Sequence, residues 1–322
     1  KAGSILRINL SKSNFKKEIL EEPKTYWSLE DVVINAQKNI YTGNSIEAID
    51  DLNDLLGKSV RDQMVADVPL GAFLSGGIDS SLIVSLMQSQ SSVPIDTFTI
   101  GFSEDDYNEA IFAKKIAKHL GTKHTELYVS SNDALSVVDK LPKIYDEPFS
   151  DSSQIPTYLI SEMTKKNVSV SLSGDAGDEL FGGYNRYLWT RKIWSRIKFM
   201  PISLRKFITY GMTSVSPSAW NKILKQILDT PQPGDKMHKL SSILTSSSAE
   251  DCYLNLISHW NNSDNIVIGA TDISVPVNNI NDHLDFDSIE QKMMYLDAIS
   301  YLPDDILTKI DRASMSVSLE TR

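Results

Sequence analysis

The sequence has one cysteine, Cys252, among its 322 residues, so no disulfide bond can form within it. It has no apolar run near the roughly 18 residues that a membrane-spanning helix needs. No apolar block within the first ten residues resembles a secretory signal. The chain also lacks an excess of basic charge: 32 Lys and Arg face 42 Asp and Glu, and the net charge of -10 argues against general nucleic-acid binding. These absences favour a cytoplasmic protein that binds neither membranes nor nucleic acid.

What is present is an ordinary globular composition, with 41% hydrophobic and 23% charged residues. Such a chain can bury a sizeable core. The chain begins with Lys1 rather than methionine and stops at Arg322 without a closing element, so we expect a fragment of a longer protein. We interpret residues 1–45 as the tail of an upstream domain with its linker.

Strand and helix signals alternate four times between residues 46 and 184. This pattern predicts a parallel sheet with helices on both faces, in which ligands bind at the carboxyl ends of the strands. The predicted strands are 70–74, 97–102, 124–129 and 168–172, and the predicted helices are 46–65, 78–87, 108–120, 132–145 and 155–167.

Helical signals dominate residues 185–322. Prolines between Ile202 and Pro233 indicate several short helices, and helices are expected at 291–302 and 304–315, with a loop at 261–285. The basic, aromatic segment Arg186–Lys206 has two interpretations. Nucleic-acid binding is one, but the overall acidity favours an amphipathic helix with a solvated or domain-facing basic side.

Leu70–Ser81, with the sequence Leu-Gly-Ala-Phe-Leu-Ser-Gly-Gly-Ile-Asp-Ser-Ser, joins the first core strand to its helix through a glycine turn. Glycines let an anion approach the backbone, and the N–H groups at a helix start attract it. Ser75, Ser80 and Ser81 add hydroxyl donors. A phosphate here would repel Asp79 unless a divalent cation bridges the two. The alternative is an ordinary Gly-Gly turn.

A second small-residue bend, Ser173–Tyr184, follows the fourth predicted strand and carries three carboxylates. Asp175 and Asp178 are three residues apart, so a helical turn places them on one side. With a nucleotide in place, Asp79 and Asp178 are expected to share Mg²⁺ with its phosphates. The alternative is that these acids only favour a helix start.

The lysine-containing phosphate loop Gly-x-x-x-x-Gly-Lys is absent. Instead, Ser75–Ser81 resembles the pyrophosphate loop of the N-type ATP pyrophosphatases. Ser173–Tyr184 resembles the synthetase domain of the class B, glutamine-hydrolysing asparagine synthetases. Asp146-Glu147-Pro148 and the late segments Leu307–Met315 and Ser318–Arg322 agree with this family. The resemblance covers about residues 20–322, implies an adenine nucleotide alpha hydrolase-like fold, and makes residues 1–45 the tail of a glutaminase domain and its linker.

The resemblance implies an enzyme that binds ATP and Mg²⁺, adenylates the side-chain carboxylate of aspartate, and releases pyrophosphate. Ammonia, delivered from the glutaminase domain, then displaces AMP to give asparagine. By position, Asp175 is the catalytic residue, standing where some members have glutamate, and Asp79 and Asp178 are the metal ligands. ATP is then held by Leu74, Ser75, Gly76, Gly77, Asp79, Ser80, Ser81, Ile100, Ser173 and Gly174.

Two departures from the family limit this expectation. Its glutaminase nucleophile, an amino-terminal cysteine, has no counterpart here, because Cys252 lies in the helical half and is expected to be a small buried side chain. The lysine that the family places later in the chain lies beyond Arg322. We therefore expect ATP binding with poor turnover from this fragment.

Two alternative functions stay open. One is amidation of another carboxylate, on a sugar or a different small molecule. The other is a nucleotide-binding regulatory domain without catalysis, against which Asp79 and Asp178 argue. The oligomeric state is also open, with a homodimer as the candidate.

Overall fold

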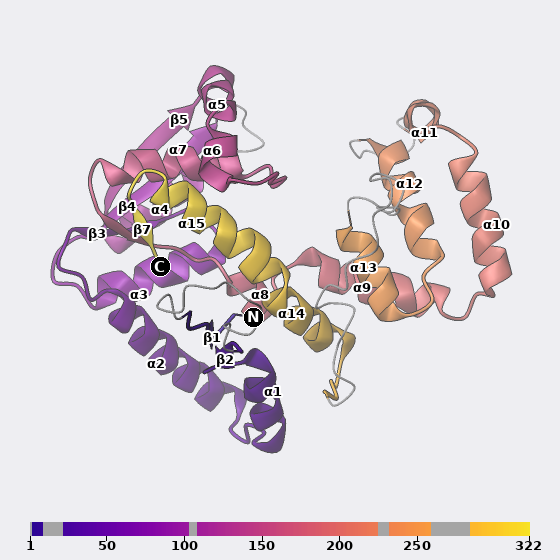
Figure 1. Cartoon of the computed structure of the whole chain (residues 1–322), viewed down its shortest axis with the longest axis horizontal. Coiled ribbons are helices and arrows are strands. Elements are labelled where there is room, and N and C mark those ends of the chain that lie inside the picture. Colours follow the sequence, from indigo (N-terminus) through magenta and orange to yellow (C-terminus); the bar gives the residue numbers. More distant parts are fainter. Residues whose placement is uncertain (1, 9–21, 103–107, 225–231, 259–283) are drawn as a thin grey trace. The chain divides into compact units, whose positions relative to one another are not determined.

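The computed structural model describes residues 2–8, 22–102, 108–224, 232–258 and 284–322 (Figure 1). They divide into two compact units. The first comprises Lys1–Gly177 with Ser300–Arg322, and the second comprises Asp178–Ile299. This division differs from the predicted one, because residues 300–322 belong with the α/β core rather than with the helical part.

The first unit is built on a five-stranded parallel sheet with the order β5-β4-β3-β6-β7. The four predicted strands are all present, which confirms the α/β class. The fifth, β7, was not predicted, because two residues carry no periodicity of their own. The strands are β3 (Leu70–Phe73), β4 (Asp96–Phe102), β5 (Lys123–Val129), β6 (Val170–Leu172) and β7 (Glu320–Thr321).

The strand order changes direction beside β3. The chain moves outward from β3 to β4 and β5, and then returns to place β6 on the other side of β3. Leu70 pairs with Val170 and Ala72 with Leu172, so the two strands end side by side. Such a switch point is where open parallel sheets bind ligands, and both bends singled out in the sequence begin there.

Helices cover both faces of this sheet, as predicted. On one face, α2, α3 and α4 pack around Ala72 and Leu172. On the other, α7 and the end of the chain pack around Phe98. The helices are α1 (Leu29–Lys38), α2 (Ser45–Gln63), α3 (Ile78–Ser89), α4 (Ala110–Leu120), α5 (Ser131–Val138), α6 (Leu141–Tyr145), α7 (Gln154–Lys165), the π-helix η5 (Leu302–Leu307) and α15 (Thr308–Met315), and a hairpin of β1 (Ser4–Ile5) and β2 (Lys24–Thr25) precedes them.

Most helix boundaries differ from the prediction by a few residues, and the helix predicted at 304–315 begins within the π-helix η5. Two differences have a clear local cause. α2 begins at Ser45 rather than at residue 46, because Asn44 caps it: the Asn44 side chain accepts hydrogen bonds from the N–H groups of Ile46 and Glu47. The helix predicted over 132–145 is two helices, α5 and α6. Ser130 caps the first, and Pro142 lies in the first turn of the second, where its missing N–H costs nothing.

The second unit is entirely helical in its described residues. Prolines separate its short helices as predicted. Arg186–Lys206 is two helices rather than one: the first ends at Ile197, and Pro201 is the N-cap of the second. The predicted loop at 261–285 lies outside the described residues up to 283. The helices are α8 (Gly177–Phe181), which starts at the unit boundary, α9 (Asn185–Ile197), α10 (Ile202–Thr213), α11 (Pro217–Leu224), α12 (Pro233–Leu244), α13 (Ala249–Ile257) and α14 (Ile289–Ile299).

A buried carboxylate anchors the helices of the second unit. Asp297 of α14 is completely buried. It accepts hydrogen bonds from Arg186 Nη2 at 2.8 Å, from the Tyr187 hydroxyl at 2.5 Å and from the Tyr253 hydroxyl. In neither unit is any described helix both long and apolar enough to cross a membrane.

Candidate functional site

The bend after β3 is braced by its own serines. The Ser75 and Ser80 hydroxyls are 2.9 Å apart, and Ser75 Oγ accepts a hydrogen bond from Gly77 N at 3.2 Å. Ser81 Oγ donates to the Gly77 carbonyl at 2.5 Å. The hydroxyls predicted to hold phosphate therefore also fix the shape of the loop. No described side chain caps α3 at Gly77, which leaves its N-terminal N–H groups for an anion.

Glycine is required at position 76. Gly76 has a φ of +87°, in the left-handed region. A Cβ there would also lie 2.8 Å from Ala113 N of α4. The loop therefore lies directly against α4.

The bend after β6 lies against the first bend. A Cβ on Gly174 would be 2.7 Å from Ser80 N, and a Cβ on Gly177 would be 2.5 Å from Asp79 Cγ. Residues 75–81 and 173–177 are thus in contact, as the sequence analysis predicted. Asp178 is the first residue of the second unit, so its sharing of a metal ion with Asp79 stays a prediction.

The predicted catalytic carboxylate, Asp175, reaches solvent at this bend. Burial by the surrounding protein raises its pKa above the ordinary value. A hydrogen bond with Ser173 and the positive charge of Lys309 act in the opposite direction. Asp175 is therefore a better proton acceptor than an isolated aspartate.

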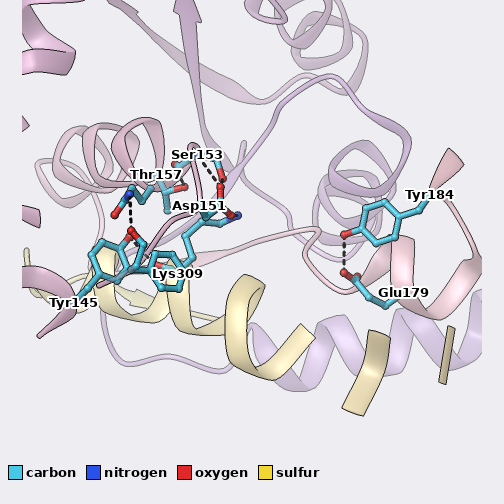
Figure 2. Close-up of polar contacts among 9 residues, drawn as sticks. Tyr145, Asp151, Ser153, Thr157, Glu179, Tyr184 and Lys309 are labelled. Atoms are coloured by element: carbon cyan, nitrogen blue, oxygen red, sulfur yellow. Dashed lines mark hydrogen bonds and ion pairs between the residues drawn. The ribbon is translucent and has the colours of Figure 1, made fainter. Parts of the chain in front are cut away.

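A nearly buried ion pair supplies that positive charge (Figure 2). Lys309 Nζ donates to Asp151 Oδ2 at 2.7 Å, and the two side chains are 11% and 14% exposed. Ser153 donates to Asp151 through both its N–H and its hydroxyl, and the Tyr145 hydroxyl donates to the Lys309 carbonyl. No local signal in the sequence pointed to Asp151, because nothing in its neighbourhood along the chain indicates the distant Lys309.

Two predicted nucleotide contacts come from the core. Leu74 is completely buried, so its side chain belongs to the sheet packing and only its backbone is available to a ligand. Ile100 of β4 is half-buried against the cluster that contains Val129 and Tyr158. Ser173 donates its N–H to the Arg322 carbonyl at 2.9 Å, so its backbone joins β6 to the end of the described chain.

The donor set fits magnesium only with help from a nucleotide. Among the described residues, no group of three or more His, Cys, Asp or Glu side chains is arranged to hold a metal. Mg²⁺ is commonly held by one or two carboxylates together with substrate phosphates and waters. Asp79 at the end of an uncapped helix suits that arrangement, and Asp178 is the expected second ligand.

Cys252 plays no part in this site. It is completely buried in α13. Burial raises the pKa of its thiol to about 11, which leaves little nucleophilic thiolate. The expectation of a small buried side chain fits this placement.

Comparison with known proteins identifies the chain. The profile of the asparagine synthase family matches residues 51–322. The chain belongs to the asparagine synthase family. This confirms the resemblance drawn from the two bends.

Individual asparagine synthase relatives agree over most of the chain. Asparagine synthetase [glutamine-hydrolyzing] 1 of Bacillus subtilis is 31% identical over 276 residues, which is 85% of this chain and 41% of the relative. A relative in Methanocaldococcus jannaschii is 43% identical over 164 residues, covering 51% of this chain and 30% of the relative. The chain therefore spans less than half the length of these relatives.

Proposed function

We propose that this chain performs the ATP-dependent, amide-forming half of asparagine synthesis. The aspartate side-chain carboxylate attacks the α-phosphorus of ATP and pyrophosphate leaves. Ammonia then attacks the acyl carbon and AMP leaves, so that asparagine, AMP and pyrophosphate are formed. The observation that carries the proposal is the contact between the two bends at the switch point of the sheet.

The first bend suits pyrophosphate as a leaving group. The uncapped start of α3 presents N–H groups and the positive end of the helix dipole to the β- and γ-phosphates. Charge that develops on the bridging oxygen is stabilised without a lysine in the loop. A bound Mg²⁺ would neutralise further phosphate charge, with Asp79 and Asp178 as its protein ligands.

The second bend suits the ammonia step. Attack on the acyl carbon produces a positively charged nitrogen that must lose a proton. Asp175, whose pKa burial raises, is proposed to accept it. Lys309 places a positive charge nearby, which opposes the rise in the pKa of Asp175.

Isotope transfer tests the adenylation step. The full-length protein is supplied with ATP, Mg²⁺, ammonia and aspartate labelled with oxygen-18 in its side-chain carboxylate. Adenylation predicts that the label appears in the phosphate of AMP, with one pyrophosphate released for each asparagine. Formation of ADP and phosphate, or unlabelled AMP, would overturn the mechanism. Label transfer only from another carboxylic acid would keep the chemistry and replace the acceptor.

Asp79→Asn tests the metal ligand. The change removes the negative charge that is proposed to bind Mg²⁺, so we expect pyrophosphate release to fall by about 100-fold or more. Pyrophosphate release is measured over a range of Mg²⁺ concentrations. Unchanged release with unchanged Mg²⁺ dependence would count against an enzymatic role for the first bend.

A further inference from the structure

Two glycines lie directly against the two carboxylates assigned to the metal. A Cβ on Gly177 would lie 2.5 Å from Cγ and 2.9 Å from Oδ1 of Asp79. A Cβ on Gly183 would lie 3.0 Å from Cγ of Asp178 and would overlap its Oδ1. Real Cβ atoms almost never make such contacts, so at each site the absence of a side chain is what leaves room for the carboxylate.

Conformation does not explain these two glycines. Neither Gly177 nor Gly183 is among the described glycines with positive φ, so the backbone at each position suits any residue. Gly57 of α2 and Gly211 of α10 provide a contrast, because a Cβ on either would meet nothing within 4 Å. Space for a carboxylate is therefore the property that distinguishes Gly177 and Gly183.

We propose that Gly177 and Gly183 are positioning residues that set the orientation of the Asp79 and Asp178 carboxylates toward a magnesium–triphosphate. The inference rests on the proposed function, since it assigns these carboxylates to the metal. It adds that residues 173–184 contribute the space around both carboxylates, through Gly177 and Gly183, as well as the Asp178 ligand itself.

The surroundings of Gly183 prevent it from moving aside. Its N–H donates to the Asp178 carbonyl at 3.0 Å, which closes the turn after α8. The next residue, Tyr184, donates its hydroxyl to the buried Glu179 of α8 at 2.6 Å (Figure 2). The Arg186 guanidinium lies 3.7 Å from the centre of the Tyr184 ring. Arg186 is in turn held by Asp297.

Because the backbone is held, an added methyl group displaces the carboxylate instead. At Gly183 the atom in the way is the far end of the Asp178 side chain rather than backbone of another segment. Gly183→Ala is therefore expected to fold normally and to turn the carboxylate out of place. Removing a group that orients a metal ligand typically lowers metal affinity by about 10- to 100-fold, and we expect a loss in this range.

The test measures metal binding without turnover. Mn²⁺ binding to the full-length protein is followed by electron paramagnetic resonance in the presence of α,β-methylene ATP, which cannot be cleaved at the reacting bond. The variants are Gly177→Ala and Gly183→Ala. The matched controls are Gly57→Ala in the first unit and Gly211→Ala in the second, both expected to leave Mn²⁺ affinity unchanged.

A double-mutant cycle shows whether Gly183 acts through Asp178. If it does, Gly183→Ala lowers Mn²⁺ affinity in the wild-type background and adds nothing in the Asp178→Asn background. Should Gly183→Ala fail to fold, Asp178→Ala is added to it. Recovery of folding in that double variant would support the proposed contact, and continued unfolding would overturn it.

Failure of the inference is distinguishable from failure of the proposed function. If Asp79→Asn and Asp178→Asn weaken Mn²⁺ binding while both glycine variants bind normally, the positioning role is refuted and the metal site stands. If neither asparagine variant changes Mn²⁺ binding or pyrophosphate release, the metal assignment fails, and the positioning role fails with it.

Discussion

Replacing Lys309 by methionine removes one partner of a nearly buried ion pair and keeps most of the side-chain volume. Asp151 Oδ1 retains its two hydrogen bonds from Ser153, but Oδ2 loses its bond from Lys309 Nζ, 2.7 Å away. Breaking a buried pair in this way costs about 3–5 kcal/mol. The slight exposure of both side chains, 11% and 14%, favours the lower end.

We therefore expect Lys309→Met to lower the free energy of unfolding by about 3 kcal/mol at pH 7. For a domain of this size, that loss corresponds to a melting temperature lower by about 6–12 °C. Thermal unfolding followed by circular dichroism measures it. Lys123→Met, which breaks the pair with Asp96 in which the two side chains are 70% and 27% exposed, is the control and is expected to change the melting temperature little.

The pH dependence of the free energy of unfolding tests the same ion pair in a second way. Burial alone raises the pKa of Asp151, but hydrogen bonds from Lys309 and Ser153 outweigh it and lower the pKa below its ordinary value of 3.8. A lowered folded-state pKa adds stability above about pH 4 that is lost as pH falls through the folded value. In Lys309→Met the burial remains without the lysine, so the pKa of Asp151 rises. The stability difference between variant and wild type should then narrow between pH 7 and pH 4.

A double-mutant cycle with Asp151→Asn isolates the pair. We expect a coupling energy of at least about 1 kcal/mol between the two positions. Additive effects, or a stability loss that stays constant between pH 7 and pH 4, would refute the interpretation of Lys309 and Asp151 as an energetically coupled pair.

Two further changes test two separate features: the contact of the two bends with each other, and the buried carboxylate in the core of the second unit. Gly174→Ala places a Cβ 2.7 Å from Ser80 N, and because backbone cannot swing aside, the bends must separate. We expect about 1–3 kcal/mol of destabilisation and weaker binding of α,β-methylene ATP by calorimetry, and normal binding would contradict the contact. Asp297→Asn leaves the Arg186 guanidinium without its carboxylate. We expect a loss of about 3–5 kcal/mol and faster hydrogen exchange in α9, α13 and α14, and exchange at the wild-type rate would contradict the anchoring role.

Local sequence was enough to predict the sheet and its two bends. The apolar runs of β3 to β6 and the glycines that follow β3 and β6 are short-range signals, because a strand end and a tight turn depend on neighbouring residues. The family resemblance also rests on contiguous motifs. Helix ends were less predictable, as at Asn44 and Pro142, where capping competed with the apolar periodicity.

Tertiary structure decided what joins distant segments. β7 exists only because Glu320 and Thr321 pair with Val170 and Ser171. A strand of two residues is too short for its sequence pattern to predict such pairing. Asp151 meets Lys309 across 158 positions of the chain, beyond the reach of any local rule.

The sequence by itself determined that two small-residue bends would follow parallel strands, and the residue types of those bends led to the prediction of phosphate and metal binding. Only the folded chain decided that Gly174 and Gly177 would lie on Ser80 and Asp79, because those contacts depend on β6 returning to pair with β3. The residue types at a site can be predicted from the local sequence, whereas the distances between those residues depend on the order of the strands in the sheet.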